Sequence, residues 1–313
     1  MTIRAGMVQK LLPFFSLIAL FIFLSIASPH FLTSINLSSV VRQTAVINIM
    51  ALGMTLVIVS GGIDLSVGAI LAFAGTMGTM CMVAGWGMGT GILVAVLCGS
   101  LWGFVNGFLT VSLKIPPFIV TLGTLGIARG LTLIISGGLP VSGLPDEFKF
   151  LGEGTIGPVP TVLPVLLVCA ALTYVVLHST KLGRYTYAIG SNKAAAIYAG
   201  IPVAGYTIAV YAISGMLTGV SSMIEASRLM TGQPTAGQGY ELLVIAAVVI
   251  GGGSLSGGEG SVVGTLIGAF IMGLLANGSD LLGINPYVQQ ALIGAVIIGA
   301  VALDEARKRR FTA

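Results

Sequence analysis

The sequence has little charge, and it contains no stretch long enough to form a soluble domain. Only 8% of its 313 residues are charged, while 56% are hydrophobic and 45 are glycine. Apart from Arg129, the charges lie in short gaps between long uncharged segments. About 20 apolar residues in a helix cross a hydrocarbon core of about 30 Å. The scarcity of charge therefore predicts a chain built of membrane spans.

The period-two alternation of polar and apolar residues that marks a membrane β-barrel is also missing. Helices then remain as the way to satisfy the backbone in lipid. The abundant glycine suits helices that pack closely there. We expect an all-α integral membrane protein that forms one transmembrane domain over residues 1–313, with lipid bilayer around it.

Residues that carry catalytic or redox chemistry are few. Cys81, Cys98 and Cys169 lie in apolar runs without CxxC spacing and are expected to be buried packing thiols. His30 and His178 are too far apart for a metal motif, and the chain has neither a Gly-Lys dipeptide for a P-loop nor a Gly-x-Ser-x-Gly elbow. A membrane-embedded enzyme is therefore the least favoured class, and we expect no bound cofactor or metal. Energy for uphill transport must come from another subunit or from an ion gradient.

Hydropathy predicts ten spans. The uncharged stretch from residue 65 to 113 is 49 residues long, which is about 73 Å as a helix. It must hold two spans, with a turn at residues 85–91. The first span is expected to be retained, because Ser25-Ile26-Ala27 is a poor signal-peptide cleavage site. The predicted spans are residues 11–28, 43–61, 66–84, 91–113, 117–136, 161–177, 203–225, 240–252, 262–277 and 287–303.

Basic residues predict the orientation. With the amino terminus inside, ten of the fourteen Lys and Arg fall on the cytoplasmic face, so both termini are expected in the cytoplasm. This distribution explains the net charge of +4 without a nucleic-acid partner. The ten are Arg4, Lys10, Lys114, Lys181, Arg184, Lys193, Arg307, Lys308, Arg309 and Arg310.

Two spans lead into glycine-rich breaks: residues 50–54 lead to a break at 60–66, and residues 246–249 lead to one at 251–258. Transporters commonly contain repeated halves with broken helices at the substrate path, although abundant glycine alone could produce the match. Asp64 lies in the first break, where it could accept hydrogen bonds from the first amides of the next helix. Alternatively, Asp64 and Ser66 could gate a path through the break.

Three charged residues within or at the edge of the spans need an account. Arg129 lies about 13 residues into the fifth span, where an unpaired charge is costly and a functional placement is the default expectation. It could snorkel toward the outer face or line a polar cavity. Glu225 and Arg228 are three residues apart and could pair on one helical face, or contact substrate.

The longest cytoplasmic loop covers residues 178–202. Asn192 can cap a short helix from Lys193 to Ala199, which Gly200 ends and Pro202 prevents from continuing. A short capped helix at the membrane surface suits docking of a partner, and the alternative is a plain basic connector. The residues expected to matter for docking are Lys181, Gly183, Arg184, Gly190, Asn192, Ala195 and Gly200.

The motifs in this loop resemble those of ribose-type (monosaccharide) permeases of ATP-binding-cassette importers, the inner-membrane components of binding-protein-dependent transport systems. The matching segments are Leu-Gly-Arg-Tyr at 182–185, Ala-Ile-Gly-Ser-Asn at 188–192 and Gly-Ile-Pro at 200–202. Residues 53–68, 233–242 and 264–277 are also similar, and the resemblance covers almost the entire chain. The family usually has Thr where Gly253 stands and often an acid near Leu243, which leaves Glu241 as the acid of that turn.

The resemblance implies a permease subunit of an ATP-driven sugar importer in the bacterial inner membrane, with ribose as the first choice of sugar. It also implies a cytoplasmic ATPase that uses the ATP and docks on the loop, a binding protein outside, and a second copy of the chain or a related permease. A neutral sugar fits the shortage of intramembrane charge. The path or gating candidates are Asp64, Ser66, Asn106, Thr121, Thr124, Arg129, Glu241 and Gly252.

Three alternatives stay open. The first is a permease of the same family for another monosaccharide. The second is a relative that carries branched-chain amino acids. The third is an ion-coupled secondary transporter, which also has broken helices but needs an ionisable residue at mid-membrane, where Arg129 alone comes near.

Overall fold

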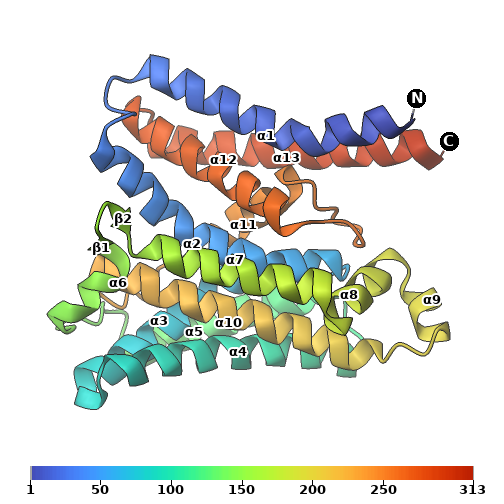
Figure 1. Ribbon diagram of the computed structural model, residues 1–313. Helices are drawn as coiled ribbons and strands as arrows, with labels where there is room; N and C mark the ends of the chain where they lie inside the picture. The colour runs from blue at the N-terminus through green and yellow to red at the C-terminus, as the bar shows by residue number, and fades with distance from the viewer. Residues whose placement is uncertain (1, 313) are drawn as a thin grey trace.

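The computed structural model describes the backbone of residues 2–312 and the side chains of residues 12–285, 287–299 and 301–302. The described chain is an elongated bundle of long helices (Figure 1). The helices are α1 (Thr2–Ala27), α2 (Ser34–Val59), α3 (Val67–Cys81), α4 (Met88–Ser112), α5 (Pro117–Ser136), α6 (Lys149–Glu153), α7 (Val162–Ser179), α8 (Lys181–Ser191), α9 (Lys193–Tyr198), α10 (Val203–Leu229), α11 (Tyr240–Ile250), α12 (Val262–Leu281) and α13 (Pro286–Thr312).

The remaining elements are short and lie in the connections. Met82–Trp86 is a π-helical turn that ends α3, and Asp146–Phe148 is a 3₁₀ turn before α6. Strands β1 (Thr155–Ile156) and β2 (Val159–Pro160) pair antiparallel, with Thr155 opposite Pro160. Gly85 and Gly87 both have φ of +84°, a conformation that glycine adopts freely, so the chain reverses within the predicted turn.

Each of the ten predicted spans coincides with a helix of the described chain. Among the described residues, seven helices are long and apolar enough to cross a membrane: Ser34–Val59, Val67–Trp86, Met88–Ser112, Pro117–Ser136, Val162–Ser179, Val203–Leu229 and Val262–Leu281. Three shorter apolar helices occupy the other predicted positions: Leu12–Ala27, Tyr240–Ile250 and Tyr287–Gly299. The all-helical membrane character expected from composition is therefore confirmed.

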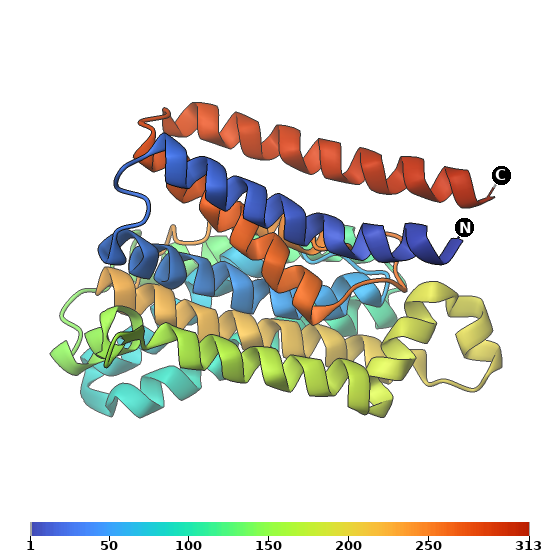
Figure 2. The same ribbon diagram turned by 45° about the horizontal axis from the view of Figure 1, so that its top comes forward.

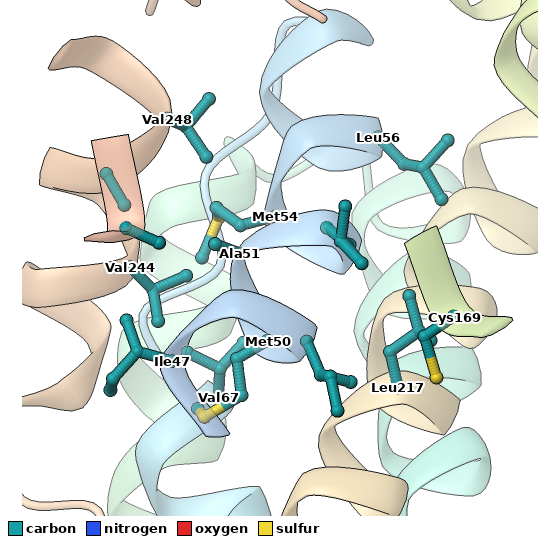
Figure 3. Packing of buried hydrophobic residues seen from close by; sticks show 14 of the residues in the cluster. Ile47, Met50, Ala51, Met54, Leu56, Val67, Cys169, Leu217, Val244 and Val248 are labelled. Atoms are coloured by element: carbon teal, nitrogen blue, oxygen red, sulfur yellow. The ribbon is translucent and has the colours of Figure 1, made fainter. Parts of the chain in front are cut away.

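Helix α2 forms the centre of the bundle. Side chains on all its faces are buried from Thr44 to Val59, as expected of a helix with an apolar circumference. Met50 and Met54 pack with Val244 and Val248 of α11 in the main hydrophobic core (Figure 3). Cys169 of α7 belongs to the same core, where it is a buried free thiol as predicted.

Glycine sets the distance between α4 and α10. A Cβ added at Gly99 would overlap the carbonyl oxygen of Gly215, and one added at Gly215 would overlap that of Gly99. At Gly103 an added Cβ would overlap the carbonyl oxygen of Tyr211. Small residues that let two backbones touch are the usual means by which helices associate in lipid. This contact holds α10 against the outer helix α4.

The two ends of the bundle differ. In both views the start of α1 and the end of α13 lie at the end that carries α8 and α9 (Figures 1 and 2). The short elements α6, β1 and β2 lie at the opposite end. This arrangement agrees with the prediction that both termini and the basic loop share one face.

Candidate functional site

The first break, residues 60–66, separates α2 from α3. It begins with a turn at Gly61, whose φ is +82°, where the amide of Gly62 donates to the carbonyl of Val57 at 2.9 Å. Gly61 thereby supplies the left-handed conformation that ends many helices. The turn leads the chain into residues 63–66, which are not helical.

Asp64 is the centre of a buried hydrogen-bonded cluster. Its Oδ1 accepts from the amide of Ser66 at 2.9 Å and from the Ser66 hydroxyl at 2.5 Å. On α4, the Asn106 amide nitrogen donates to Ser66 Oγ at 2.8 Å and lies 3.5 Å from Asp64 Oδ2. On α5, Thr124 donates to Asn106 Oδ1 at 2.7 Å. Four residues named as path or gating candidates from the sequence therefore lie in one network.

A fifth candidate, Thr121, joins the same region through the backbone. Its hydroxyl donates to the carbonyl of Ile63 at 3.2 Å, and the buried hydroxyl of Tyr211 reaches that carbonyl at 3.4 Å. All of these side chains are buried within the single chain. In this structure they therefore hold the first break between α4, α5 and α10, and their role in passage or gating remains a prediction.

The second break, residues 251–261, separates α11 from α12. Gly252, another predicted candidate, has a φ of +91° beside the turn in which the amide of Gly253 donates to Val248 O at 2.8 Å. The amide of Gly258 donates to Val59 O at 2.9 Å, so the second break rests on the end of α2, beside the first. The two breaks that the sequence related to each other are thus neighbours in space.

Gly253 stands where the family usually has Thr, and its surroundings are tight. A Cβ there would lie 2.6 Å from Cγ1 of Val248. The same Cβ would lie 2.9 Å from the carbonyl oxygen of Val248, so a threonine here would require both the side chain and the backbone of Val248 to move. Glycine at this position thus lies close to both the side chain and the backbone of Val248.

Arg129 has an arrangement that the sequence did not suggest. Its Nη1 donates to the carbonyls of Pro234 and Ala236 at 2.7 and 2.9 Å, and its Nη2 to Gly68 O at 3.3 Å. Residues 231–239, which precede α11, are not helical, so carbonyls that are not paired within their turns, such as those of Pro234 and Ala236, need donors from elsewhere in the protein. Arg129 supplies those donors and binds the stretch to α3, rather than snorkelling.

Glu241 begins α11 beside this stretch. Its Oε2 would lie 2.6 Å from a Cβ added at Gly68, and a Cβ there would also overlap the carbonyl oxygen of Gly237. Gly68 therefore allows the approach of the residues that lead into α11. Glu241 and Arg129 are both adjacent to Gly68, at the start of α3.

The predicted pair of Glu225 and Arg228 forms on α10, with Arg228 Nη1 at 2.9 Å from Glu225 Oε2. Structural pairing is therefore the interpretation that the geometry favours. Tyr240, which the sequence did not single out, donates its hydroxyl to Glu225 Oε1 at 3.0 Å. No local pattern could have revealed this contact, because the two residues lie 15 positions apart on different helices.

The loop of residues 178–202 holds two helices, where the sequence predicted one. As predicted, the Asn192 side chain accepts from the amide of Ala195 at 2.9 Å, and Gly200 ends the turn at φ of +77°. The missed helix is α8, whose cap is Thr180, accepting from the amide of Gly183 at 3.3 Å. Thr180 before Gly183 was the available signal for this helix.

Helix α9 projects from the bundle (Figures 1 and 2). Tyr198 is 91% exposed and Ile197 is 55% exposed at its end. Lys181, Arg184, Asn192, Ala195 and Gly200 are exposed as well, whereas Gly183 is buried and Gly190 is partly buried. The predicted docking residues therefore divide into an exposed set and a set that packs against the bundle.

Comparison with known proteins gives a consistent result along the whole chain. Residues 36–301 match the family model described as branched-chain amino acid transport system / permease component. The ribose import permease protein of Bacillus subtilis (strain 168) is 43% identical over 301 residues, covering 96% of this chain and 94% of that protein. Its counterpart in Escherichia coli (strain K12) is 42% identical over 300 residues, covering 94% of each chain. No solved structure matches the chain significantly.

More distant relatives carry other sugar names. The D-allose transport system permease protein of Escherichia coli (strain K12) is 38% identical, covering 90% of this chain and 87% of that protein. The L-arabinose transport system permease protein of the same strain is 37% identical, covering 93% and 88%.

Proposed function

Because this chain belongs to the family of branched-chain amino acid transport system / permease components, we propose that it is the membrane permease of an ATP-driven sugar importer. Ribose is the proposed sugar. The observation that carries this proposal is 43% identity to a ribose import permease over 96% of the chain. Identity is lower to the permeases named for allose and arabinose.

The proposed topology has ten membrane crossings in a single permease domain, residues 1–313, with both termini in the cytoplasm of a bacterial cell. The multi-pass membrane character follows from the helices described above. Support for the orientation comes from the start of α1, the end of α13 and helices α8 and α9, which carry basic residues and lie at one end of the bundle (Figure 1). The positive-inside rule expects such residues on the cytoplasmic face. The host membrane in this proposal is the inner membrane.

In this proposal a cytoplasmic ATPase docks on α8 and α9, uses the ATP, and leaves this chain without a cofactor of its own. Support comes from the shape of the loop, because α9 presents exposed Ile197 and Tyr198 outside the bundle. Exposed aromatic side chains are frequent anchors of protein interfaces. A binding protein would deliver the sugar at the opposite face, near α6 and the β1–β2 hairpin.

A second copy of the chain completes the path in this proposal, and pairing with a related permease is the alternative. Support comes from α5, whose outward glycines Gly123, Gly126 and Gly130 have no described atom within 4 Å of an added Cβ. Thr121 and Thr124 lie on the opposite, buried face of the same helix. A helix with one face in the polar cluster and one open face suits a position beside a path.

A permease for branched-chain amino acids is the second candidate, because the family description carries that name. Such a substrate has a positive and a negative charge, and both need partners in a low-dielectric path. The polar cluster offers one carboxylate, Asp64, among the neutral side chains of Ser66, Asn106 and Thr124. Hydroxyl groups of a neutral sugar match such partners better.

The test is uptake by the purified complex in liposomes. The permease, its ATPase and its binding protein are reconstituted, and entry of labelled ribose is measured with and without ATP. We expect uptake that requires ATP and the binding protein, and that excess unlabelled ribose suppresses more strongly than allose, arabinose or leucine. Suppression mainly by leucine would replace the sugar assignment, and uptake driven by an ion gradient alone would replace the ATP-driven class.

A further inference from the structure

The second half of α8 lies in backbone contact with both breaks. A Cβ added at Gly190 would overlap the carbonyl oxygen of Val59, at the end of α2, and would lie 2.6 Å from the amide nitrogen of Gly258. Real side chains do not tolerate such distances, so only glycine at position 190 allows this approach. The contact places the helix that follows α7 directly against the two segments that interrupt spans.

The two breaks meet at the same point. The carbonyl of Val59 that faces Gly190 also accepts the hydrogen bond from Gly258 at 2.9 Å. A Cβ added at Gly257 would lie 2.9 Å from Cα of Gly61 and 3.0 Å from Cα of Gly190. Gly61, Gly190, Gly257 and Gly258 therefore meet at one point. Their contact brings together three segments that are far apart in the sequence.

Tyr187 makes a second contact from the same helix. Its hydroxyl donates to the carbonyl of Gly260 at 2.7 Å. Tyr187 and Gly190 are three residues apart and so lie on one face of α8. Together they contact the second break at residues 258 and 260, close to the start of α12.

The second break is compact enough to move as one piece. Within it, the amide of Ser254 donates to Glu259 O at 3.1 Å, and the amide of Gly257 donates to Ser254 O at 2.9 Å. At its far end, Ser261 caps α12 by accepting from the amide of Gly264 at 3.1 Å. A displacement of α8 would therefore shift the loop as a unit, together with the first turn of α12.

We propose that Tyr187 and Gly190 are positioning residues that transmit movement of α8 to both breaks at once. The inference rests on the proposed function, in which a partner ATPase moves α8 and α9. At Gly190, close backbone contact transmits small displacements because no flexible side chain lies between the segments, and Tyr187 adds a direct hydrogen bond to the second break. Side chains on the exposed α9 would serve binding of the ATPase, and the buried face of α8 would serve transmission.

The experiment compares variants of the complete transporter in liposomes. Tyr187→Phe removes one hydroxyl and keeps the ring, while Gly190→Ala forces α8 away from Val59. Matched controls are Tyr287→Phe, on the exposed part of α13, and Gly205→Ala on α10, where no described atom lies within 4 Å of an added Cβ. The readouts are sugar moved per ATP hydrolysed, ATPase retained on purification and apparent unfolding temperature.

We expect Tyr187→Phe to lower the sugar moved per ATP by about five-fold while the ATPase stays bound and the unfolding temperature is kept, and Gly190→Ala to lower it further. An unchanged ratio in Tyr187→Phe would overturn the proposal. So would a loss of uptake that parallels a loss of thermal stability, because that result indicates a structural role only. Failure of the proposed function is distinguishable, since the unmodified complex would then show no ATP-dependent sugar uptake.

Discussion

The two breaks are similar in sequence but are held in opposite ways. The first break is held by side chains, because Asp64 and Ser66 bond to each other and, through Asn106, to Thr124. The second break is held mainly by backbone groups, through bonds such as Gly258 to Val59 and Gly253 to Val248, and Tyr187 adds one side-chain bond to it. Glycine gives both breaks their turns, but only the first carries a buried acid.

This difference determines which substitutions each break tolerates. A break held by side chains loses stability when polar atoms are removed, because buried donors are left without acceptors. A break held by close backbone contact is damaged when atoms are added, because the neighbouring segment has to move. The predictions below use this contrast, and each compares a variant with a control of the same chemistry.

The largest effect is expected for Gly264→Val, next to the second break. Gly251 and Gly264 bring α11 and α12 together, since an added Cβ at either one would overlap the carbonyl oxygen of the other. The separation that valine forces should lower the stability of the folded chain by about 3 kcal/mol. The apparent unfolding temperature in detergent measures the loss. Gly205→Val, at an open position of α10, is the control and should leave that temperature unchanged or slightly raised.

The next effect concerns Arg129, which joins α3 after the first break to the stretch before α11. Arg129→Met removes the donors to the carbonyls of Pro234, Ala236 and Gly68. It should lower the stability of the folded chain by about 2 to 3 kcal/mol. Proteolysis between residues 231 and 239 should become faster in the same variant. Arg129→Lys keeps one cationic donor and should recover part of the loss. Equal stability of the methionine variant and the unmodified chain would show that these carbonyls need no donor.

Asp64→Ala tests the first break. It should lower the stability of the folded chain by about 2 kcal/mol, because Ser66 and Asn106 lose an acceptor. We also expect it to abolish sugar uptake while the complex still assembles. Asp64→Asn is the matched control, since its carbonyl oxygen can still accept both bonds from Ser66. Uptake that is unchanged in the alanine variant would eliminate a gating role for Asp64.

The smallest effect is expected for Tyr240→Phe, at the start of the helix that leads into the second break. The substitution removes one hydrogen bond to Glu225, which keeps its bond to Arg228. The expected loss is about 1 kcal/mol, readable as a small shift of the unfolding temperature. The control is Tyr287→Phe, because that side chain is exposed. A loss of stability larger than that of Asp64→Ala would contradict this ranking of the variants.

Several features of the fold could be predicted because their causes are local. The turn near Gly85 and Gly87, the cap at Asn192 and the pair of Glu225 with Arg228 each depend on residues within four positions. The positions of the spans follow from hydropathy over windows of about 20 residues, which is still local along the chain. For the site, the same logic reached Asp64 and Ser66, which lie two residues apart in one turn.

Other features could not be predicted, because their cause is packing between distant segments. The contact of Ser66 with Asn106 joins residues 40 positions apart, and that of Arg129 with Pro234 joins residues 105 positions apart. Helix α8 was missed because its mean hydropathy is that of a polar connector, although local signals were present. Thr180 caps it, and its buried residues Gly183, Thr186 and Ile189 lie three positions apart. Packing between distant segments decided only where this helix lies. The same packing brings Gly190 against Val59, which no spacing along the chain indicates.

The sequence by itself determined that this protein is a helical membrane protein, where its long apolar helices lie, and where its spans are interrupted. Those properties follow from charge, hydropathy and glycine, which act on the scale of a helical turn or a membrane thickness. Only the tertiary structure decided that the two breaks touch, that Arg129 binds backbone carbonyls, and that α8 contacts both breaks. These contacts depend on how closely helices approach one another, and that distance is set by the shapes of all the packed surfaces together.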